Sequence, residues 1–281
     1  MSAEATRLAR IKDEAPLTWS AALANWSAHA WRTAAWGLLG IGLLFAAWLG
    51  FALWRGNPLL LPTPAQVLDG ISALTTSGVL FSDLLASLRR VFVGFFLASA
   101  LAVPLGLVLS YSHRLGAIFV PVVTLLRPIP PIAWIPLAIL WFGLSEGSSY
   151  YITTVAAFFP IFLSVYGGGL AVERQHIRAA ESLGATRFVI LSRIFLPAAA
   201  PSVLTGLRIG LGQAWMAVVT AELIAAQSGL GYRIQLSRLN LETAEVIACM
   251  AVIGVIGAAM TSALGWAEER LLPWQVTSRK G

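Results

Sequence analysis

Charged side chains are scarce in this chain. Asp, Glu, Lys and Arg make up 11% of its 281 residues, whereas about a quarter of the residues in a soluble globular domain are charged. Hydrophobic residues make up 58%. This balance excludes an ordinary soluble domain and predicts an all-α integral membrane protein. The arginines that give the net charge of +6 are scattered between apolar runs. They therefore argue against nucleic acid as a partner, and we expect membrane lipid instead.

Residues that carry enzyme chemistry are also few. Cys249, the sole cysteine, lies in an apolar run and can form no disulfide within the chain. His29, His113 and His176 lie outside the long apolar runs, and no H-E-x-x-H or G-x-S-x-G motif occurs. The chain also lacks a G-x-x-x-x-G-K-[ST] phosphate-binding loop. We therefore predict a non-catalytic protein with no catalytic residue, no metal site and no cofactor of its own.

Long apolar runs are the main feature that is present. A helix needs about 20 apolar residues to cross a membrane, and residues 34–54, 91–110, 150–172, 203–226 and 246–266 satisfy this. The run 115–144 is apolar too, but it contains Arg127 and a cluster of prolines that a straight helix cannot accommodate. There we predict an interfacial or partly embedded piece to about Leu126, a break at 127–131 and a spanning piece from about Ile132. The sequence thus predicts six transmembrane helices.

Arginine and lysine are unequally divided between the two sides of these six spans. One side holds Arg55, Arg89, Arg90, Arg233 and Arg238, and the side of both termini holds Arg7, Arg10, Lys12, Arg32, Arg114, Arg174, Arg178, Arg187, Arg193, Arg270, Arg279 and Lys280. Positive residues concentrate in cytoplasmic loops, so we predict that both termini are cytoplasmic.

This orientation divides the chain into four parts. Residues 1–33 are expected to be a cytoplasmic N-terminal segment with an amphipathic helix. Residues 34–79 are the first transmembrane helix and an outer loop. Residues 80–270 are the core domain, which contains a cytoplasmic loop at 173–200. Residues 271–281 are a cytoplasmic tail.

The loop 173–200 has the pattern of two short helices. QHIRAAESLG contains good helix formers and ends at Gly184, which suits a left-handed C-terminal cap. Thr186 can then cap a second helix, RFVILSRIF, which we expect to end before Pro197. Two interpretations of this loop remain open at this point. It is either a surface that another protein contacts or an amphipathic segment that rests on lipid headgroups.

The loop also resembles a family. In permease subunits of bacterial ATP-binding-cassette (ABC) importers, it follows the pattern E-A-A, three residues, G, nine residues, I-x-L-P. This chain matches that pattern except at its first position, where Arg178 replaces the glutamate, and Glu181 is out of register. The resemblance implies a coupling helix that docks an ATPase, formed by Arg178, Ala179, Ala180, Glu181, Gly184, Ala185, Ile194, Leu196 and Pro197.

The resemblance covers about residues 80–270 and implies more than this loop. RPIPPIAWIPLAILWFG (127–143), IRAAESLGA (177–185) and TGLRIGLGQAW (205–215) are similar to the branch that imports taurine, alkanesulfonates and nitrate, and residues 177–232 look most like taurine permeases. By resemblance, the chain has the type I ABC importer permease fold and forms a homodimer in the bacterial inner membrane. The resemblance also implies an extracytoplasmic solute-binding protein and two cytoplasmic ATPase subunits that bind ATP and Mg²⁺.

The resemblance further implies import by alternating access, with taurine or another sulfonate as the expected cargo. The alternative cargoes are nitrate or nitrite, bicarbonate or another small organic anion. A self-contained secondary transporter is the rival class, but such proteins have broken helices in two related halves, and only one broken segment is evident here.

The translocation path is expected near polar residues in the spans, because such residues are costly there and usually functional. Arg208 shares a helical face with residues 212, 215, 219 and 222. It either lines the path or extends its side chain to the inner headgroups. Glu222, near the outer end of that span, is expected to be a salt-bridge partner. Gly206 and Gly210 are expected to allow close helix packing. The candidate path residues are Arg127, Arg208, Gly212, Gln213 and Trp215.

Overall fold

The computed structural model describes residues 19–272, with side chains from residue 35 onwards. Within this range every regular element is a helix. Residues up to Pro64 form one unit, which contains α2 (Trp19–Arg55). The predicted first span, 34–54, lies within α2, where the indole of Trp48 donates a hydrogen bond to the carbonyl of Pro62 (3.1 Å). The expected amphipathic face of residues 17–33 and the tail beyond residue 272 lie outside the described side chains and residues.

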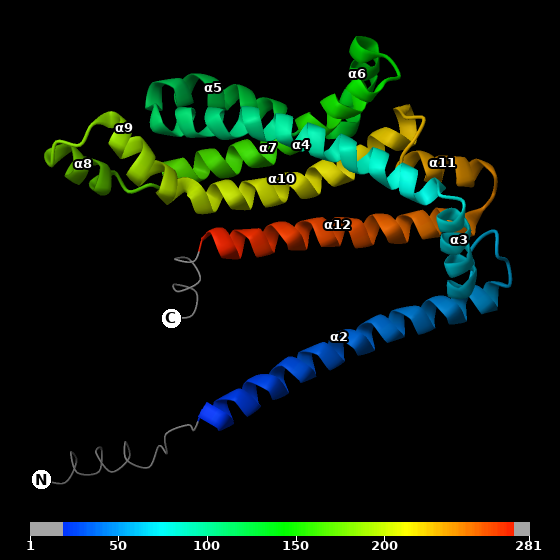
Figure 1. Ribbon diagram of the computed structural model, residues 1–281. Coiled ribbons are helices and arrows are strands. Elements are labelled where there is room, and N and C mark those ends of the chain that lie inside the picture. Colours follow the sequence, from blue (N-terminus) through cyan, green and yellow to red (C-terminus); the bar gives the residue numbers. More distant parts are fainter. Residues whose placement is uncertain (1–18, 273–281) are drawn as a thin grey trace, which may run out of the picture. The chain divides into compact units, whose positions relative to one another are not determined.

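The second unit is built around α7 (Glu146–Leu170), which packs against α4 (Val79–Tyr111) and α10 (Leu196–Ala225) (Figure 1). The helix α12 (Thr243–Leu271) packs against α10. Helices α4, α7, α10 and α12 are each long and apolar enough to cross a membrane, as is α2 in the first unit. The core shared by α4, α7 and α10 is apolar and includes Val91, Phe95, Ala98, Ala102, Ala157, Ile161, Phe162, Val165, Leu211, Ala214 and Val218.

The proline-rich segment is broken where the sequence indicated. The helix α5 (His113–Leu126) ends just before Arg127, and the chain resumes with the 3₁₀ helix η1 (Pro131–Trp134) and α6 (Ile135–Phe142) after a 90° bend. The prediction of a spanning helix from Ile132 is wrong in its length. Residues 131–142 reach only about 18 Å, because a helix rises about 1.5 Å per residue. The sixth predicted span is therefore a bent pair of short helices. Five helices among residues 19–272 are long enough to span, and the number of spans is six if the bent pair counts as one.

Close packing between α7 and α10 depends on small residues. A Cβ atom added to Gly206 would lie 2.7 Å from Cβ of Ser164 and 3.2 Å from the carbonyl oxygen of Ile161. A Cβ at Gly210 would overlap the side chain of Ile161, and one at Gly168 would overlap Ser202. The predicted packing role of the glycines at 206 and 210 is confirmed, since only a residue without a side chain lets the two backbones approach this closely.

Two helices lie where the sequence suggested only loops. The helix α3 (Pro64–Thr76) starts with proline at its first position, where the missing N–H costs nothing, and it buries Val67 and Leu74. The helix α11 (Leu230–Leu239) follows a turn at Gly229, which has φ 109°. In Figure 1, α3, α6 and α11 lie at one end of the second unit, and α8 and α9 lie at the other. These two ends are called the α11 end and the α8 end below.

The glycine contacts lead to a test of stability. We expect Gly206→Ala to lower the stability of the purified protein by about 1–3 kcal/mol, because the new methyl group must push apart two backbones. Gly212→Ala, on the same helix, is the matched control, because a Cβ there meets nothing within 4 Å. It should leave stability unchanged or raise it by up to about 1 kcal/mol through helix propensity. Thermal unfolding in detergent measures both, and equal shifts would contradict the packing role of Gly206.

Candidate functional site: the α8–α9 loop, the α10–α12 wall and a buried ion cluster

The loop at 173–200 begins with α8 (Arg174–Ser182), which ends in a well-defined turn. Gly184 has φ 77°, the left-handed conformation predicted for it. The N–H of Ala185 donates to the carbonyl of Ala180 and the N–H of Gly184 donates to that of Glu181, both at 3.0 Å. This pair of bonds is a Schellman motif, which ends a helix and fixes the direction of the following chain. The direction of the loop after α8 therefore depends on Gly184.

The second helix of the loop begins as predicted but does not end as predicted. The hydroxyl of Thr186 caps α9 (Arg187–Ile190) by accepting from the N–H of Val189 (3.4 Å). The expectation that this helix ends before Pro197 is wrong. One turn of π-helix, η2 (Leu191–Phe195), joins α9 to α10, so Arg187–Ala225 is a single helix. In the π turn the N–H of Leu196 bonds to the carbonyl of Leu191, and this wider turn accommodates the proline that follows it.

The loop presents two chemically different faces. Leu183 and Phe188, at its tip, are 89% and 76% exposed, and the small residue Ala179 lies on the same side of α8 as Leu183 by helical spacing. The opposite face of α8 carries Arg174, Ile177, Arg178 and Glu181 and lines a cavity of about 460 Å³. Of the two faces, the apolar tip is the better candidate for a protein contact, because exposed aliphatic and aromatic side chains near the end of a helix indicate a contact surface.

The remaining residues of the predicted docking set follow this division. Arg178, Ala179, Ala180, Glu181, Gly184 and Ala185 lie within α8 or the turn after it. Ile194 lies in the π turn, and Leu196 and Pro197 begin α10. The structure thus places the first six residues in α8 and the turn after it, with Arg178 and Glu181 on the cavity face, and the last three at the base of the loop.

Of the five candidate path residues, the structure brings Gly212 and Trp215 together. They line an apolar cavity of about 460 Å³ between α10 and α12, with Val219 on the same side. The indole N–H of Trp215 donates to the carbonyl of Ile253 (3.1 Å). Gly257 lets the ring lie against α12, since a Cβ there would be 2.8 Å from it. These residues form the α10–α12 wall.

The other three candidates lie elsewhere. Nη1 of Arg208 is 3.4 Å from Oε2 of Glu268 on α12, and both side chains are partly exposed. Gln213 is exposed on α10. Arg127 is exposed at the C-terminal cap of α5. The expected common face of α10 is therefore split between a partly exposed ion pair, an apolar wall and a buried ion cluster.

That cluster lies at the α11 end and is centred on Arg90, which is 2% exposed. Its Nε and Nη2 donate to the two carboxylate oxygens of Glu146 (2.9 and 2.6 Å), and its Nη1 donates to Glu222 (2.7 Å). Nη1 and Nη2 also donate to the carbonyl and hydroxyl oxygens of Ser228 (2.6 and 2.8 Å). A guanidinium group has five N–H donors, so Arg90 uses all of them and joins α4, α7, α10 and the turn before α11.

The same cluster binds the turn before α11 through its backbone. Glu222 is 1% exposed and accepts from the hydroxyl of Ser87 (2.8 Å) and the N–H of Gly231 (3.0 Å). The N–H of Gly229 donates to Asp83 (2.9 Å), which also accepts from Nε of Arg233 (2.9 Å). The N–H of residue 230 donates to the hydroxyl of Ser87 (2.9 Å). Three successive backbone donors are thus bound by side chains of α4 and α10.

Comparison with known proteins identifies this architecture. Residues 94–275 match the family described as binding-protein-dependent transport system inner membrane component. The chain belongs to this family. It is 40% identical over 239 residues to the taurine transport system permease protein TauC of Escherichia coli K12, covering 83% of this chain and 86% of TauC. The nitrate import permease protein NrtB of Synechocystis sp. is 29% identical over 244 residues, covering 84% of this chain and 88% of NrtB.

Among solved structures, a chain of the MetNI methionine ABC transporter in an inward-facing conformation has a TM-score of 0.59 at 20% identity, covering 71% of this chain and 97% of that chain. This likeness shows that the permease shares the fold of ABC importer membrane subunits. The protein is therefore a multi-pass inner-membrane permease subunit and a non-catalytic transport component.

Sequence reasoning found part of the buried cluster in this permease. Glu222 was expected to be a salt-bridge partner, which its ion pair with Arg90 confirms. Asp83, Ser87 and Arg90 were missed because the expected span began at residue 91, whereas α4 starts at Val79 and buries all three. Their spacing of four and three residues places them on one helical face, and this was the available signal.

The cluster leads to a second test of stability. Arg90→Met should cost the permease about 3–5 kcal/mol, because it leaves Glu222 charged, buried and without its main partner. The adjacent Arg89 is the matched control. Its side chain is 60% exposed and its Nη2 lies 3.2 Å from Glu146, so Arg89→Met should cost less than about 1 kcal/mol. Denaturant unfolding of the two purified variants measures the difference in the free energy of unfolding. An equal decrease in both variants would show that the buried cluster around Arg90 is not the main stabilising contact.

Proposed function

We propose that this permease imports taurine or another small sulfonate, and that its α8–α9 loop docks a cytoplasmic ATPase subunit. In this proposal it works as a homodimer with two such ATPase subunits, and an extracytoplasmic solute-binding protein delivers the cargo. The observation that carries the docking assignment is the exposed apolar tip, Leu183 and Phe188, on a loop whose direction is set by the Schellman turn at Gly184. The level of identity to TauC, compared with that to NrtB, supports a sulfonate as the cargo.

The distribution of charge supports an orientation with the α8 end in the cytoplasm. Arg174, Arg178, Arg187 and Arg193 lie in the α8–α9 loop, and the end of α12, with Arg270, lies at the same end of the second unit (Figure 1). At the α11 end, Arg90 and Arg233 are bound in ion pairs with acidic groups. Free positive residues favour the cytoplasmic side of a membrane. We therefore assign the docking loop and both termini to the cytoplasm.

The continuous helix Arg187–Ala225 gives this proposal a mechanical basis. It begins in the docking loop and carries Arg208, Gly212 and Trp215 further along its length. A displacement of the loop when the ATPase subunits bind ATP and Mg²⁺ would be carried along this helix, with no flexible joint in between. The π turn at 191–195 and two prolines, Pro197 and Pro201, lie on that route, and π turns often lie at functional positions.

The path for an anion is proposed along α10. A sulfonate loses hydration on entering the membrane, and fixed donors must replace the lost water. Arg208 offers a planar group that can bind two oxygens at once. Its contact with Glu268 is long (3.4 Å) and partly exposed, so such a pair contributes little to stability, and an incoming anion can compete for the guanidinium. The apolar wall at Gly212 and Trp215 lies further along the same helix.

Gly184→Val tests the docking assignment. A β-branched residue is strained at φ 77°, so the turn after α8 should change direction. We expect the permease to insert, while uptake and ATP hydrolysis stimulated by the binding protein fall to background in reconstituted vesicles. Gly78→Val is the matched control, since Gly78 has φ 73° and the same open surroundings but lies before α4. Normal stimulation in Gly184→Val, or equal losses in both variants, would refute the docking role.

Arg208→Gln tests the path. It keeps hydrogen-bond donors but removes the charge, so we expect uptake to slow several-fold while the ATPase still assembles with the permease. Arg208→Lys should recover only part of the rate, because a point charge lacks the planar fork. Arg270→Gln is the control. Arg270 lies on α12 at the same end and stacks on Trp266 (4.2 Å to the ring centroid), so its loss should leave uptake unchanged. Unchanged uptake in Arg208→Gln would make Arg208 a headgroup anchor.

The cargo itself is tested on the binding protein. We expect a ligand screen on that protein to select taurine or an alkanesulfonate over nitrate, nitrite and bicarbonate. Selection of nitrate or another small organic anion would change the cargo and leave the permease architecture as described.

A further inference from the structure

We propose that the cavity behind α8 is a binding site for a tetrahedral oxyanion, which is a sulfate, sulfonate or phosphate group. The cavity is separate from the α10–α12 wall and from the buried cluster at the α11 end. It is a half-open cavity lined by the last turns of α4 and α7, the inner face of α8, Arg187 and the π turn, and its volume is about 460 Å³. Small-molecule sites have volumes of roughly 300–1,000 Å³, so this cavity is large enough for the proposed group.

The charges around the cavity favour an anion. Three guanidinium groups line it, those of Arg174, Arg178 and Arg187, and Glu181 is the one carboxylate among its lining residues. None of these three arginines has an ion pair or side-chain hydrogen bond to any side chain among residues 35–272. In contrast, Arg90 and Arg233 at the α11 end form ion pairs with acidic groups. The donors at the α8 end are therefore available to a ligand.

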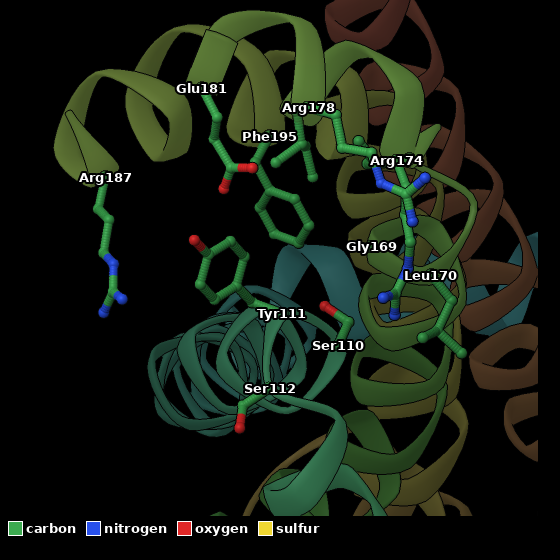
Figure 2. A pocket seen from close by; sticks show the side chains of 12 residues that line it. Ser110, Tyr111, Ser112, Gly169, Leu170, Arg174, Arg178, Glu181, Arg187 and Phe195 are labelled. Carbon is green, nitrogen blue, oxygen red and sulfur yellow. The ribbon is translucent and has the colours of Figure 1, made fainter. Parts of the chain in front are cut away.

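The arginines approach the cavity from different elements. Arg174 and Arg178 are one turn apart on α8, and Arg187 begins α9 across the turn at Gly184. Figure 2 shows Arg174 and Arg178 together on one side of Phe195 and Tyr111 and Arg187 on the other side. The two guanidinium groups on α8 can contact different oxygens of one anion, and such charge-assisted bonds are stronger than neutral ones. Arg187 adds a further positive charge across the cavity. The shape of the site thus depends on the same turn that directs the loop.

The base of the cavity adds hydroxyl groups to the guanidinium donors. The rings of Tyr111 and Phe195 meet edge to face, with centroids 5.4 Å apart. The hydroxyl of Tyr111 has no hydrogen-bond partner among the described residues, and Ser112 also lines the cavity. An oxyanion accepts hydrogen bonds only, so guanidinium and hydroxyl donors are the groups that suit it.

The site and the proposed docking surface occupy opposite faces of α8. The positions lining the cavity are 174, 177, 178 and 181, whereas the exposed apolar residue Leu183 faces the other way by helical spacing. An ATPase contact on the apolar tip therefore leaves the cavity side of α8 uncovered. An anion held there by Arg174 and Arg178 would restrain α8 against the ends of α4 and α7, which also line the cavity. The proposal does not depend on which cargo the transporter carries.

The test uses the full transporter with its ATPase subunits, in nanodiscs of phosphatidylcholine alone. Radiolabelled sulfate is titrated at constant ionic strength, because exposed charges are screened by salt. We expect saturable binding that Arg174→Gln and Arg178→Gln each weaken by about tenfold, the effect of losing one charge-assisted contact. Arg193→Gln is the matched control, since it removes the same charge from the same loop outside the cavity. It should bind sulfate as the unaltered protein does.

A second arm separates the two sources of such a group. The transporter is placed in nanodiscs that contain phosphatidylglycerol, extracted in detergent and analysed by native mass spectrometry for retained lipid. Retention that Arg174→Gln and Arg178→Gln abolish, and Arg193→Gln does not, would identify an anionic lipid headgroup as the occupant. Cavity-dependent sulfate binding without lipid retention would identify a soluble anion. The proposal is overturned if neither sulfate binding nor lipid retention differs between the cavity variants and the Arg193→Gln control. Assembly with the ATPase, followed in the same samples, shows separately whether docking has failed.

Discussion

The buried side chain of Arg90 is the contact on which the packing of the second unit depends most. It binds carboxylates from α7 and α10 and both oxygens of Ser228, so four parts of the chain meet at one guanidinium group. A charge in this position is expensive to desolvate, and only complete hydrogen bonding offsets that cost. Glu146 and Glu222 each accept further bonds from protein donors. The cluster therefore fixes one end of the helix core, and the proposed docking loop lies at the other end.

The two ends of the second unit thus use arginine in opposite ways. At the α11 end, Arg89, Arg90 and Arg233 form ion pairs with Asp83, Glu146 and Glu222, so three charges of each sign offset one another within the protein. At the α8 end, the guanidinium groups face a cavity or the surroundings. This contrast is an electrostatic polarity along the helix axes. This difference in the pairing of arginines supports both the proposed orientation and the proposed anion site.

Much of this architecture could be predicted from the sequence, because apolar runs of about 20 residues report directly on spanning helices. The turn at Gly184 and the cap at Thr186 were also accessible, since each follows from one residue type in one backbone conformation. The end of the second loop helix at Pro197 was wrong, because a π turn removes the conflict between proline and a continuing helix and leaves no clear mark in the sequence.

The buried cluster was only partly predictable for a different physical reason. Asp83 and Arg90 look like residues of a loop or a helix edge when they are considered along the chain. They become buried only because partners more than fifty residues away neutralise and bind them. In the same way, the separation of Arg208 from the apolar wall depends on where α12 packs, which helical spacing on α10 alone does not give.

The glycines between α7 and α10 have a consequence for how the permease changes shape. Where two backbones touch without side chains between them, no rotamer change can absorb a shift, so the two helices translate and rotate together. The ion cluster joins α4 to both α7 and α10, so we expect the three helices to move as one rigid body. The seam between α10 and α12 is different, because it contains the cavity beside Trp215. We infer that α4, α7 and α10 move as a group relative to α12 along this looser seam during transport. The packing among these three helices would stay unchanged.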